Sequence, residues 1–372
     1  MYAKSNNYIN YRSSFGTIHR SLTVFIMAFA LTLSVAGKSF ATGPDGPVNL
    51  YSYRQSFLMD PLLEAFTKET GIKVNAVYAK NGILQRLKSE GMNSPADVVL
   101  AADVTRIDEI AKAGLLAPVS SSVLEKNIGP SYRHPENLWF GLTYRARVIF
   151  AHKERVKSGE IKTYEDLADP RFKGRICIRS GKHEYNITLL ASMINALGKE
   201  KAEIWLRGLK ENLARRPQGN DRAQVNAIYE GECDISVGNS YYFGKMITNK
   251  EKPEQQKWAE AVNIIFPNQP DGKIAENSPL ARGAHVNISA AAMTKSAKHQ
   301  KAAIRLLEFL ASDTAQQIYA AQNFEYPLKK DVPLHPMVAS WGKFRADTQN
   351  LSDIAALHEE ATKMMDRVGF DN

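Results

Sequence analysis

Two adjacent tyrosines, Tyr241 and Tyr242, follow the turn-forming run 238–240, and Tyr185 lies 56 residues earlier between a glutamate and an asparagine. A tyrosine hydroxyl has an ordinary pKa near 10, and a highly charged cation stabilises its deprotonated form. The resulting phenolate is a hard oxygen donor, which suits a hard metal ion better than a soft one. Taken alone, the same residues also fit a tyrosine pair that packs at a surface and a single tyrosine on an exposed helix.

Other kinds of chemistry find little support in the sequence. There is no His-x-x-x-His, His-Glu-x-x-His or Cys-x-x-Cys pair, no glycine-rich nucleotide loop and no Gly-x-Ser-x-Gly elbow. We therefore expect neither a zinc site, a nucleotide site nor a serine-hydrolase centre. His183 lies two residues from Tyr185, but a histidine at the start of a helix is the simpler interpretation, and His285 is predicted to be structural.

The elements that must position these side chains begin with an alternation of strands and helices. In the first half, strands are predicted at 48–52, 72–78 and 96–100, and helices at 60–70, 81–90 and 105–113. This βαβαβ order predicts a parallel sheet flanked by helices. Asp60 and Pro61 are residue types favoured at an N-cap and a first helical position, so the first helix is predicted to begin there.

A second unit of the same design is predicted after a long apolar strand at 139–150 that crosses between the two. Strands are predicted at 174–179, 233–237 and 263–267, and helices at 184–197, 301–321 and 355–365. Two α/β lobes joined by extended crossings enclose a cleft, and ligands of such sheets bind at the carboxyl ends of strands. The segments predicted to line the cleft are therefore 51–56, 180–186 and 239–242.

Length and composition agree with two soluble domains behind a targeting segment. The chain has 372 residues, of which 44% are hydrophobic and 23% are charged, and this length exceeds one typical core. Residues 1–41 are predicted to be a signal peptide, because a basic start precedes the apolar run 22–35 and Ser39-Phe40-Ala41 fits the small-x-small cleavage pattern. An uncleaved anchor is the alternative.

Net charge and cysteine content indicate which partners and which cellular compartment are compatible with the sequence. The first 41 residues carry four basic residues and no acid, so their removal lowers the formal net charge from +9 to +5. The remaining Lys and Arg are scattered, which argues against a nucleic-acid partner. Cys177 and Cys233 lie beside strand-like segments of the same half; an oxidising compartment would permit a disulfide, and the sequence leaves its formation open.

Several segments resemble one family, the bacterial periplasmic ferric-ion-binding proteins, which are transferrin-like and feed an ABC transporter. The resemblance covers nearly all of the chain after residue 41. The segments that carry it are YSYRQ (51–55), SPADVVLAAD (94–103), WFGLTYRARVI (139–149), IRSGKHEYN (178–186), RRPQGNDRAQV (215–225), VGNSYYFGKM (237–246) and FEYPL (324–328). The double tyrosine after Gly-Asn-Ser, with the earlier Glu-Tyr-Asn, is the most specific part.

The resemblance implies a set of ligands. The metal ligands of the family fall on Tyr185, Tyr241 and Tyr242. Many relatives add a His-Tyr pair in the loop after the first strand, where this chain reads Tyr53-Arg54-Gln55-Ser56 and has no histidine. The chain is therefore similar to the subset in which three tyrosines and carbonate or bicarbonate hold Fe³⁺, with Arg54 and Gln55 expected to bind the anion.

Some positions near this site are left open by the resemblance. Tyr53 is predicted to be core or to lie behind the ligands, and Arg145 is a candidate for a supporting role. The backbone N–H groups of Ser180-Gly181, ahead of the helix that carries Tyr185, are expected to be free for an anion.

The resemblance also implies a fold, a partner and a location. The fold is the two-lobed type II periplasmic-binding-protein fold, each lobe a mostly parallel sheet flanked by helices, with lobe 1 at 42–145 and 268–320 and lobe 2 at 146–267 and 321–372. The expected partner is an inner-membrane ABC permease with its ATPase. The protein is expected to be a periplasmic, non-enzymatic monomer that enters no membrane after signal cleavage. The alternatives are the same fold with an oxyanion or small organic cargo, and a periplasmic metal-dependent enzyme.

Overall fold

The computed structural model describes residues 46–372, and the predicted signal peptide lies outside the described residues. The strands are β1 Val48–Ser52, β2 Val74–Tyr78, β3 Val98–Ala101, β4 Leu116–Ala117, β5 Phe140–His152, β6 Ile176–Cys177, β7 Ile235–Asn239, β8 Val262–Ile265, β9 Val286–Thr294 and β10 Tyr326–Pro327. The helices are α1 Ser56–Thr70, α2 Ile83–Glu90, α3 Val104–Lys112, α4 Ser122–Asn127, α5 Glu184–Leu197, α6 Lys199–Glu211, α7 Asp221–Tyr229, α8 Ser240–Ile247, α9 Glu254–Glu260, α10 Gln300–Leu310, α11 Asp313–Asn323, α12 Pro336–Ser340, α13 Leu351–Ala356 and α14 His358–Val368.

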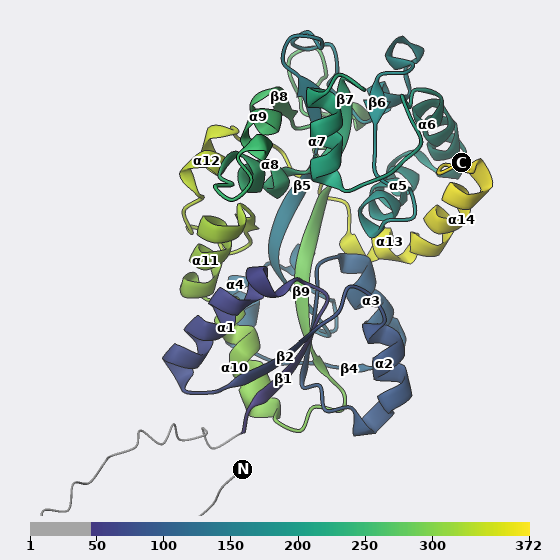
Figure 1. Ribbon diagram of the computed structural model, residues 1–372. Coiled ribbons are helices and arrows are strands. Elements are labelled where there is room, and N and C mark those ends of the chain that lie inside the picture. The colour runs from purple at the N-terminus through teal and green to yellow at the C-terminus, as the bar shows by residue number, and fades with distance from the viewer. Residues whose placement is uncertain (1–45) are drawn as a thin grey trace, which may run out of the picture. The chain divides into compact units, whose positions relative to one another are not determined.

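Strand β5 organises the sheet, and it is the crossing strand that the sequence predicts. Its first half pairs antiparallel with β9, and its second half pairs antiparallel with β7 and β8. The parallel ladders β1–β2 and β1–β3 lie on the β9 side, and the parallel ladder β6–β7 lies on the other. Figure 1 shows β5 and β9 running between the two groups of elements. The fold is thus mixed α/β, with parallel ladders joined through antiparallel crossings.

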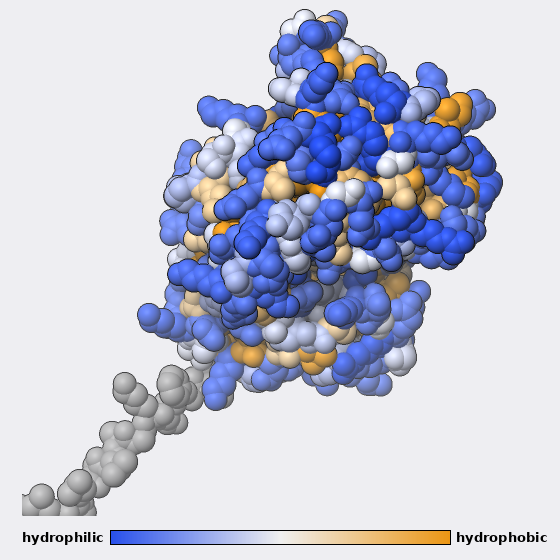
Figure 2. Space-filling view, turned by 45° about the horizontal axis from the view of Figure 1, so that its top comes forward, coloured by the Kyte–Doolittle hydropathy of each residue, from blue (hydrophilic) through white to orange (hydrophobic). Residues whose placement is uncertain are grey.

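The buried strands and amphipathic helices explain where the core lies. All four residues of β3 and all nine of β9 are buried, as expected for strands covered on both faces. Helices α1 and α10 pack on the β1–β3 side, and α5 and α6 pack beside the β6–β7 side. The face shown in Figure 2 is mostly hydrophilic, with scattered apolar residues.

Three predicted helix boundaries were wrong. Helix α1 begins at Ser56 rather than at Asp60–Pro61, and Gln55 is its extended N-cap. Pro61 lies inside the helix and removes one backbone N–H donor from it. The burial of the helix face from Leu58 to Phe66 against the sheet outweighs this loss. The predicted helices 301–321 and 355–365 are each two helices, and in the first of them Ser312 caps the start of α11 through the backbone N–H of Ala315.

The disulfide that the sequence left open is formed. Cys177 at the end of β6 bonds to Cys233, just before β7, and their Cα atoms are 5.8 Å apart. Both residues are buried. The bond joins the end of β6 to the residues just before β7, which is its parallel neighbour in the sheet.

Among the described residues, no helix is long and apolar enough to span a membrane.

Candidate functional site

The three predicted tyrosine ligands all lie in the first turns of helices. Tyr241 and Tyr242 are the second and third residues of α8, which follows β7 directly, and Tyr185 is the second residue of α5. The chain leaves strand geometry at Asn239, so the adjacent tyrosines do not point to opposite faces as they would on a strand. The rings of Tyr241 and Tyr242 stack with centroids 4.2 Å apart.

These tyrosines meet the loop after β1 around one small pocket. Its volume is about 70 Å³, and its lining includes all five predicted site residues, Arg54, Gln55, Tyr185, Tyr241 and Tyr242, together with Tyr53, Arg145 and Glu325. Segments more than 180 residues apart in the chain therefore converge at the carboxyl ends of β1 and β7, as the sequence predicts.

The environment keeps the hydroxyls of two of these tyrosines protonated in the absence of a cation. Burial and the neighbouring Tyr185 raise the pKa of Tyr241 well above its ordinary value, and the same two causes raise the pKa of Tyr242 to about 12. These two phenols therefore carry no negative charge by themselves, and a bound cation would have to displace their protons.

Arginines surround the tyrosine rings but differ in how they are paired. Arg147 and Arg179 both bond to the buried carboxylate of Asp221, at 2.8 Å each. Arg145 is also buried, but it donates to the Ser289 hydroxyl at 3.1 Å and to the carbonyl of Ala102 rather than to a carboxylate. Its guanidinium carbon lies 5.6 Å from the centroid of the Tyr185 ring. Arg145 is therefore a buried positive charge directed at the tyrosine cluster.

Arg54 lies in the pocket, but its terminal nitrogens are already engaged. Nη2 and Nη1 donate to the two carboxylate oxygens of Glu325 at 2.6 and 3.0 Å, and Nη1 also bonds to Ser289. Both side chains are almost completely buried. Only Nε lacks a partner among the described residues. Gln55, in contrast, is exposed at the N-terminus of α1 and makes no cap hydrogen bond with its side chain.

One expected anion contact was wrong. The backbone N–H of Gly181 is not free, because it donates to Asp371 Oδ1 at 2.6 Å, and the Ser180 hydroxyl bonds to the same carboxylate. The carboxylate of Asp371 thus occupies the position at which the sequence predicted a bound anion.

Three residues beside the pocket, Tyr53, His183 and His285, have structural roles. The hydroxyl of Tyr53 accepts a hydrogen bond from the backbone N–H of Leu84 at 3.0 Å, while its ring borders the pocket. His183 is the N-cap of α5, and its Nδ1 accepts from the backbone N–H of Tyr185. Burial and the nearby Arg179 lower the pKa of His183 to about 3, so the ring is neutral at physiological pH. His285 is buried, as expected for a structural histidine.

A larger cleft of about 530 Å³ adjoins the tyrosine pocket and shares Tyr53, Gln55, Tyr185 and Tyr242 with it. Five basic residues line this cleft, against two acids, Asp103 and Glu184. The basic residues are Lys80, Arg106, Arg179, Lys182 and Arg222. The excess of positive charge favours anions beside the tyrosines.

Glu325 and Asp221 are the functional candidates that sequence reasoning missed. Glu325 lies in the segment FEYPL, and Asp221 lies in RRPQGNDRAQV, both of which carry the family resemblance. The only feature of the sequence that could have indicated them was the presence of a carboxylate in each of these segments. Their arginine partners lie 271 and 42 to 74 residues away, so the pairing could not be read from spacing.

Comparison with known proteins shows to which family the chain belongs. Residues 93–350 match the model of a family described as bacterial extracellular solute-binding proteins. The chain belongs to this family. Its members bind solutes, so this solute-binding protein is not an enzyme, and the metal-dependent-enzyme alternative is excluded.

Within that family, the similarity extends to proteins of iron uptake. Iron uptake protein A1 of Synechocystis is 43% identical over 88% of each chain. The apo ferric ion-binding protein A of Pasteurella haemolytica is 47% identical, with a TM-score of 0.81 over 88% of this chain and 99% of that chain. A Trichodesmium protein solved with iron and citrate ligands is 43% identical, with a TM-score of 0.81 over 87% of this chain and 100% of that chain. The solute-binding chain thus has the periplasmic-binding-protein fold of the ferric ion-binding proteins.

Proposed function

We propose that this solute-binding protein carries ferric iron, held by the phenolates of Tyr185, Tyr241 and Tyr242 with a synergistic anion. The observation that carries the proposal is the convergence of these three tyrosines on one small pocket. Three phenolates balance the three charges of Fe³⁺ and are hard donors for a hard ion. The iron-uptake relatives support the same cargo.

The anion in this proposal is carbonate or bicarbonate, held at the first-lobe loop. The exposed amide of Gln55 at the N-terminus of α1 supports an anion there, since the first N–H groups of a helix favour negative charge. Arg54 contributes its Nε, while Glu325 occupies its other nitrogens and neutralises its charge. Arg145, which has no carboxylate partner among the described residues, supplies the positive charge that offsets the excess negative charge of a carbonate beside three phenolates.

Citrate is the alternative anion. The Trichodesmium relative was solved with iron and citrate, and the basic cleft beside the tyrosines, at about 530 Å³, has room and charge for a polycarboxylate. The second candidate cargo, an oxyanion or small organic solute without iron, uses the same arginines but needs no tyrosine.

Membership of the solute-binding family suggests how the iron is delivered to a transporter. We propose that the mature protein works in the periplasm as a monomer, that the tyrosine ligands of lobe 2 and the anion loop of lobe 1 close on the metal, and that the loaded protein docks on an ABC permease driven by its ATPase. The lobe boundaries in this scheme are 42–145 with 268–320 and 146–267 with 321–372.

The test is a visible absorption titration of the iron-free mature protein with a ferric salt in bicarbonate buffer, repeated with citrate in place of bicarbonate. We expect a saturable phenolate-to-iron charge-transfer band at one iron per chain. Loss of an outer partner of a metal site typically costs about 10–100-fold in affinity, so each of Tyr185→Phe, Tyr241→Phe and Tyr242→Phe should cost at least as much.

The matched control is Tyr229→Phe, at an exposed tyrosine on α7 outside the pocket. Its titration should equal that of the wild type. A protein that stays colourless in both buffers contradicts the proposal and favours an iron-free anionic cargo. A band that forms only with citrate retains the iron and the tyrosines but replaces carbonate.

A further inference from the structure

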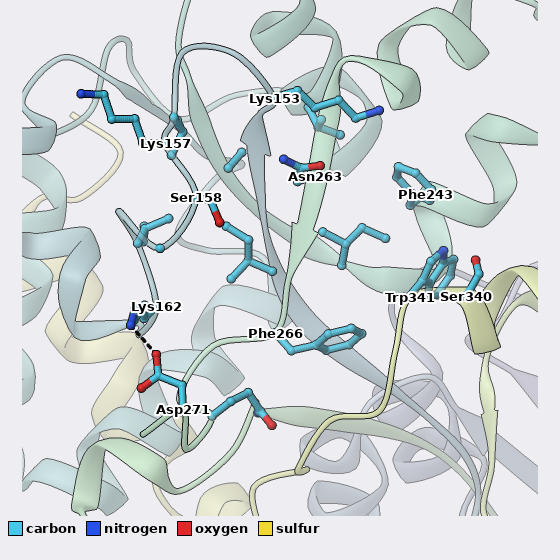
Figure 3. A pocket seen from close by; sticks show the side chains of 18 residues that line it. Lys153, Lys157, Ser158, Lys162, Phe243, Asn263, Phe266, Asp271, Ser340 and Trp341 are labelled. Atoms are coloured by element: carbon cyan, nitrogen blue, oxygen red, sulfur yellow. Dashed lines mark hydrogen bonds and ion pairs between the residues drawn. The ribbon is translucent and has the colours of Figure 1, made fainter. Parts of the chain in front are cut away.

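A second hollow lies away from the tyrosine pocket and shares no residue with it. This groove has a volume of about 690 Å³ and is lined by β8, by the loop 153–162 after β5, and by residues of α8 and α12. The size falls within the range of roughly 300–1,000 Å³ that is typical of small-molecule sites. Figure 3 shows the loop on one side of the strands and the aromatic residues Phe243 and Trp341 on the other.

One wall of the groove is aromatic. Phe243 and Trp341 meet edge to face with ring centroids 5.9 Å apart, and Phe266 stacks on Phe344 at 4.3 Å. All of these rings are only half-buried. The indole Nε1 of Trp341 is buried, and it has no hydrogen-bond partner among the described residues. Half-buried rings in such arrangements favour contact with a further aromatic ring.

The charge at the rim is positive. Lys153, Lys157 and Lys162 line the groove, and Asp271 is the only acid in its lining. Asp271 is paired with Lys162, whereas Lys153 has no carboxylate within ion-pair distance in the part of the chain that the structure describes. Figure 3 shows the ammonium of Lys153 on the side of Phe243, while Lys157 extends away from the aromatic wall.

We propose that this groove binds a small aromatic carboxylate. The ring of the ligand lies against Phe243, Phe266 and Trp341, where offset or edge-to-face packing is favourable, and its carboxylate pairs with Lys153. The apolar side chains of Ile264 and Ile265 disfavour a strongly charged body, Asn263 beside them adds a polar contact, and the unpaired Lys153 selects an anion over a cation. This site is separate from the proposed iron site, although α8 carries Tyr242 in one and Phe243 in the other.

The probe for the test is 2-naphthoate, measured by calorimetric titration of the mature protein, with 2-naphthylmethylammonium as its cationic counterpart. We expect one saturable 2-naphthoate site per chain and no binding of the cation. Lys153→Met should weaken 2-naphthoate binding about tenfold, as loss of a charge-assisted hydrogen bond does. Lys153 is exposed, so this change leaves the fold intact.

Lys157→Met is the matched control, because it removes an equal charge from a side chain that extends away from the rings, and it should bind 2-naphthoate like the wild type. Trp341→Leu should abolish binding while thermal unfolding stays cooperative. Absence of a saturable site, equal affinity in Lys153→Met, or displacement of 2-naphthoate by ferric citrate would each overturn the proposal. The charge-transfer titration on the same samples reports the iron site independently, so failure of either proposal is distinguishable.

Discussion

At the scale of single residues, the pocket depends on how two buried arginines are paired. Arg54 bonds to Glu325 through both terminal nitrogens, and Thr143 donates a third hydrogen bond to this carboxylate at 2.6 Å. Burial alone would lower the pKa of Arg54, and Glu325 more than offsets it, so the pKa is raised. Glu325 thereby fixes the loop that carries Gln55 at the pocket.

Breaking this pair leaves a buried charge without a partner. We expect Glu325→Gln to lower the free energy of unfolding by about 3 kcal/mol, which is typical when one member of a buried pair is removed. Chemical denaturation monitored by circular dichroism measures this loss.

The double variant Arg54→Met/Glu325→Gln is the control, because it removes the unpaired charge as well. It should regain most of the stability lost in the single variant. A single variant as stable as the wild type would show that Arg54 finds water or another acceptor in place of Glu325.

At the residue scale, the sequence predicted the members of the site better than their contacts. Tyr185, Tyr241 and Tyr242 could be chosen because their segments match a known pattern, and they do meet in one pocket. The partner of Arg54 could not be predicted, because a salt bridge across 271 residues depends on the packing of β10 against β5.

At the scale of elements, the junction of β7 with α8 sets the direction of the tyrosine pair. Strand β7 is held between β5 and β6, while the Cys177–Cys233 bond ties the end of β6 to the start of β7, at the end of the strand away from α8. The N–H of Asn239, the last residue of β7, donates to Asp221 Oδ2 at 2.9 Å. The pairing of Asn239 with β5 and its bond to Asp221 fix the point at which the chain turns into the helix.

Removing the disulfide should destabilise the pairing of β6 with β7. The bond closes a loop with a sequence separation of 56 residues, and chain-entropy arguments give about 4 kcal/mol for a loop of that length. We expect Cys177→Ala/Cys233→Ala to lose about this much unfolding free energy in urea titrations.

The wild type in reducing buffer is the companion measurement, because it breaks the same bond without changing the packing of side chains. It should unfold at a lower urea concentration than the oxidised protein. Equal midpoints for the oxidised protein, the reduced protein and the variant would mean that the β6–β7 ladder alone holds these two strands together.

At the scale of the whole molecule, His358 connects three helices that come from distant parts of the chain. Its Nε2 lies 3.1 Å from Glu184 on α5, and its Nδ1 lies 3.3 Å from Glu109 on α3. Burial alone would lower the pKa of His358, but the two carboxylates outweigh burial and raise it. The protonated ring therefore ties α14 to elements of both groups.

This contact predicts a pH dependence of stability. Because the folded-state pKa of His358 is raised, its contribution is fully present below the unfolded pKa of about 6.5 and is lost as the pH rises through the folded pKa. We expect His358→Gln to cost about 1–2 kcal/mol near pH 6, as for a hydrogen bond between charged groups, and much less near pH 9.

Urea unfolding at the two pH values measures the difference. His134→Gln, at a histidine outside this contact, should show no such change with pH. A gap between wild type and His358→Gln that is constant from pH 6 to pH 9 would contradict the charged pairing.

The sequence by itself determined the alternation of strands and helices, the crossing strand β5 and the tyrosine candidates, because periodicity and local motifs are properties of neighbouring residues. It misplaced the start of α1, since the packing of Leu58 to Phe66 outweighs the local preference of Asp60 and Pro61 for a helix start. Only the tertiary structure decided that Cys177 and Cys233 bond, that Glu325 neutralises Arg54 while Arg145 lacks a carboxylate, and that Asp371 fills the expected anion position. Each of these contacts joins residues far apart in the chain, and their distances are set by the packing of β5, β7, β10 and the C-terminal helices rather than by any local pattern.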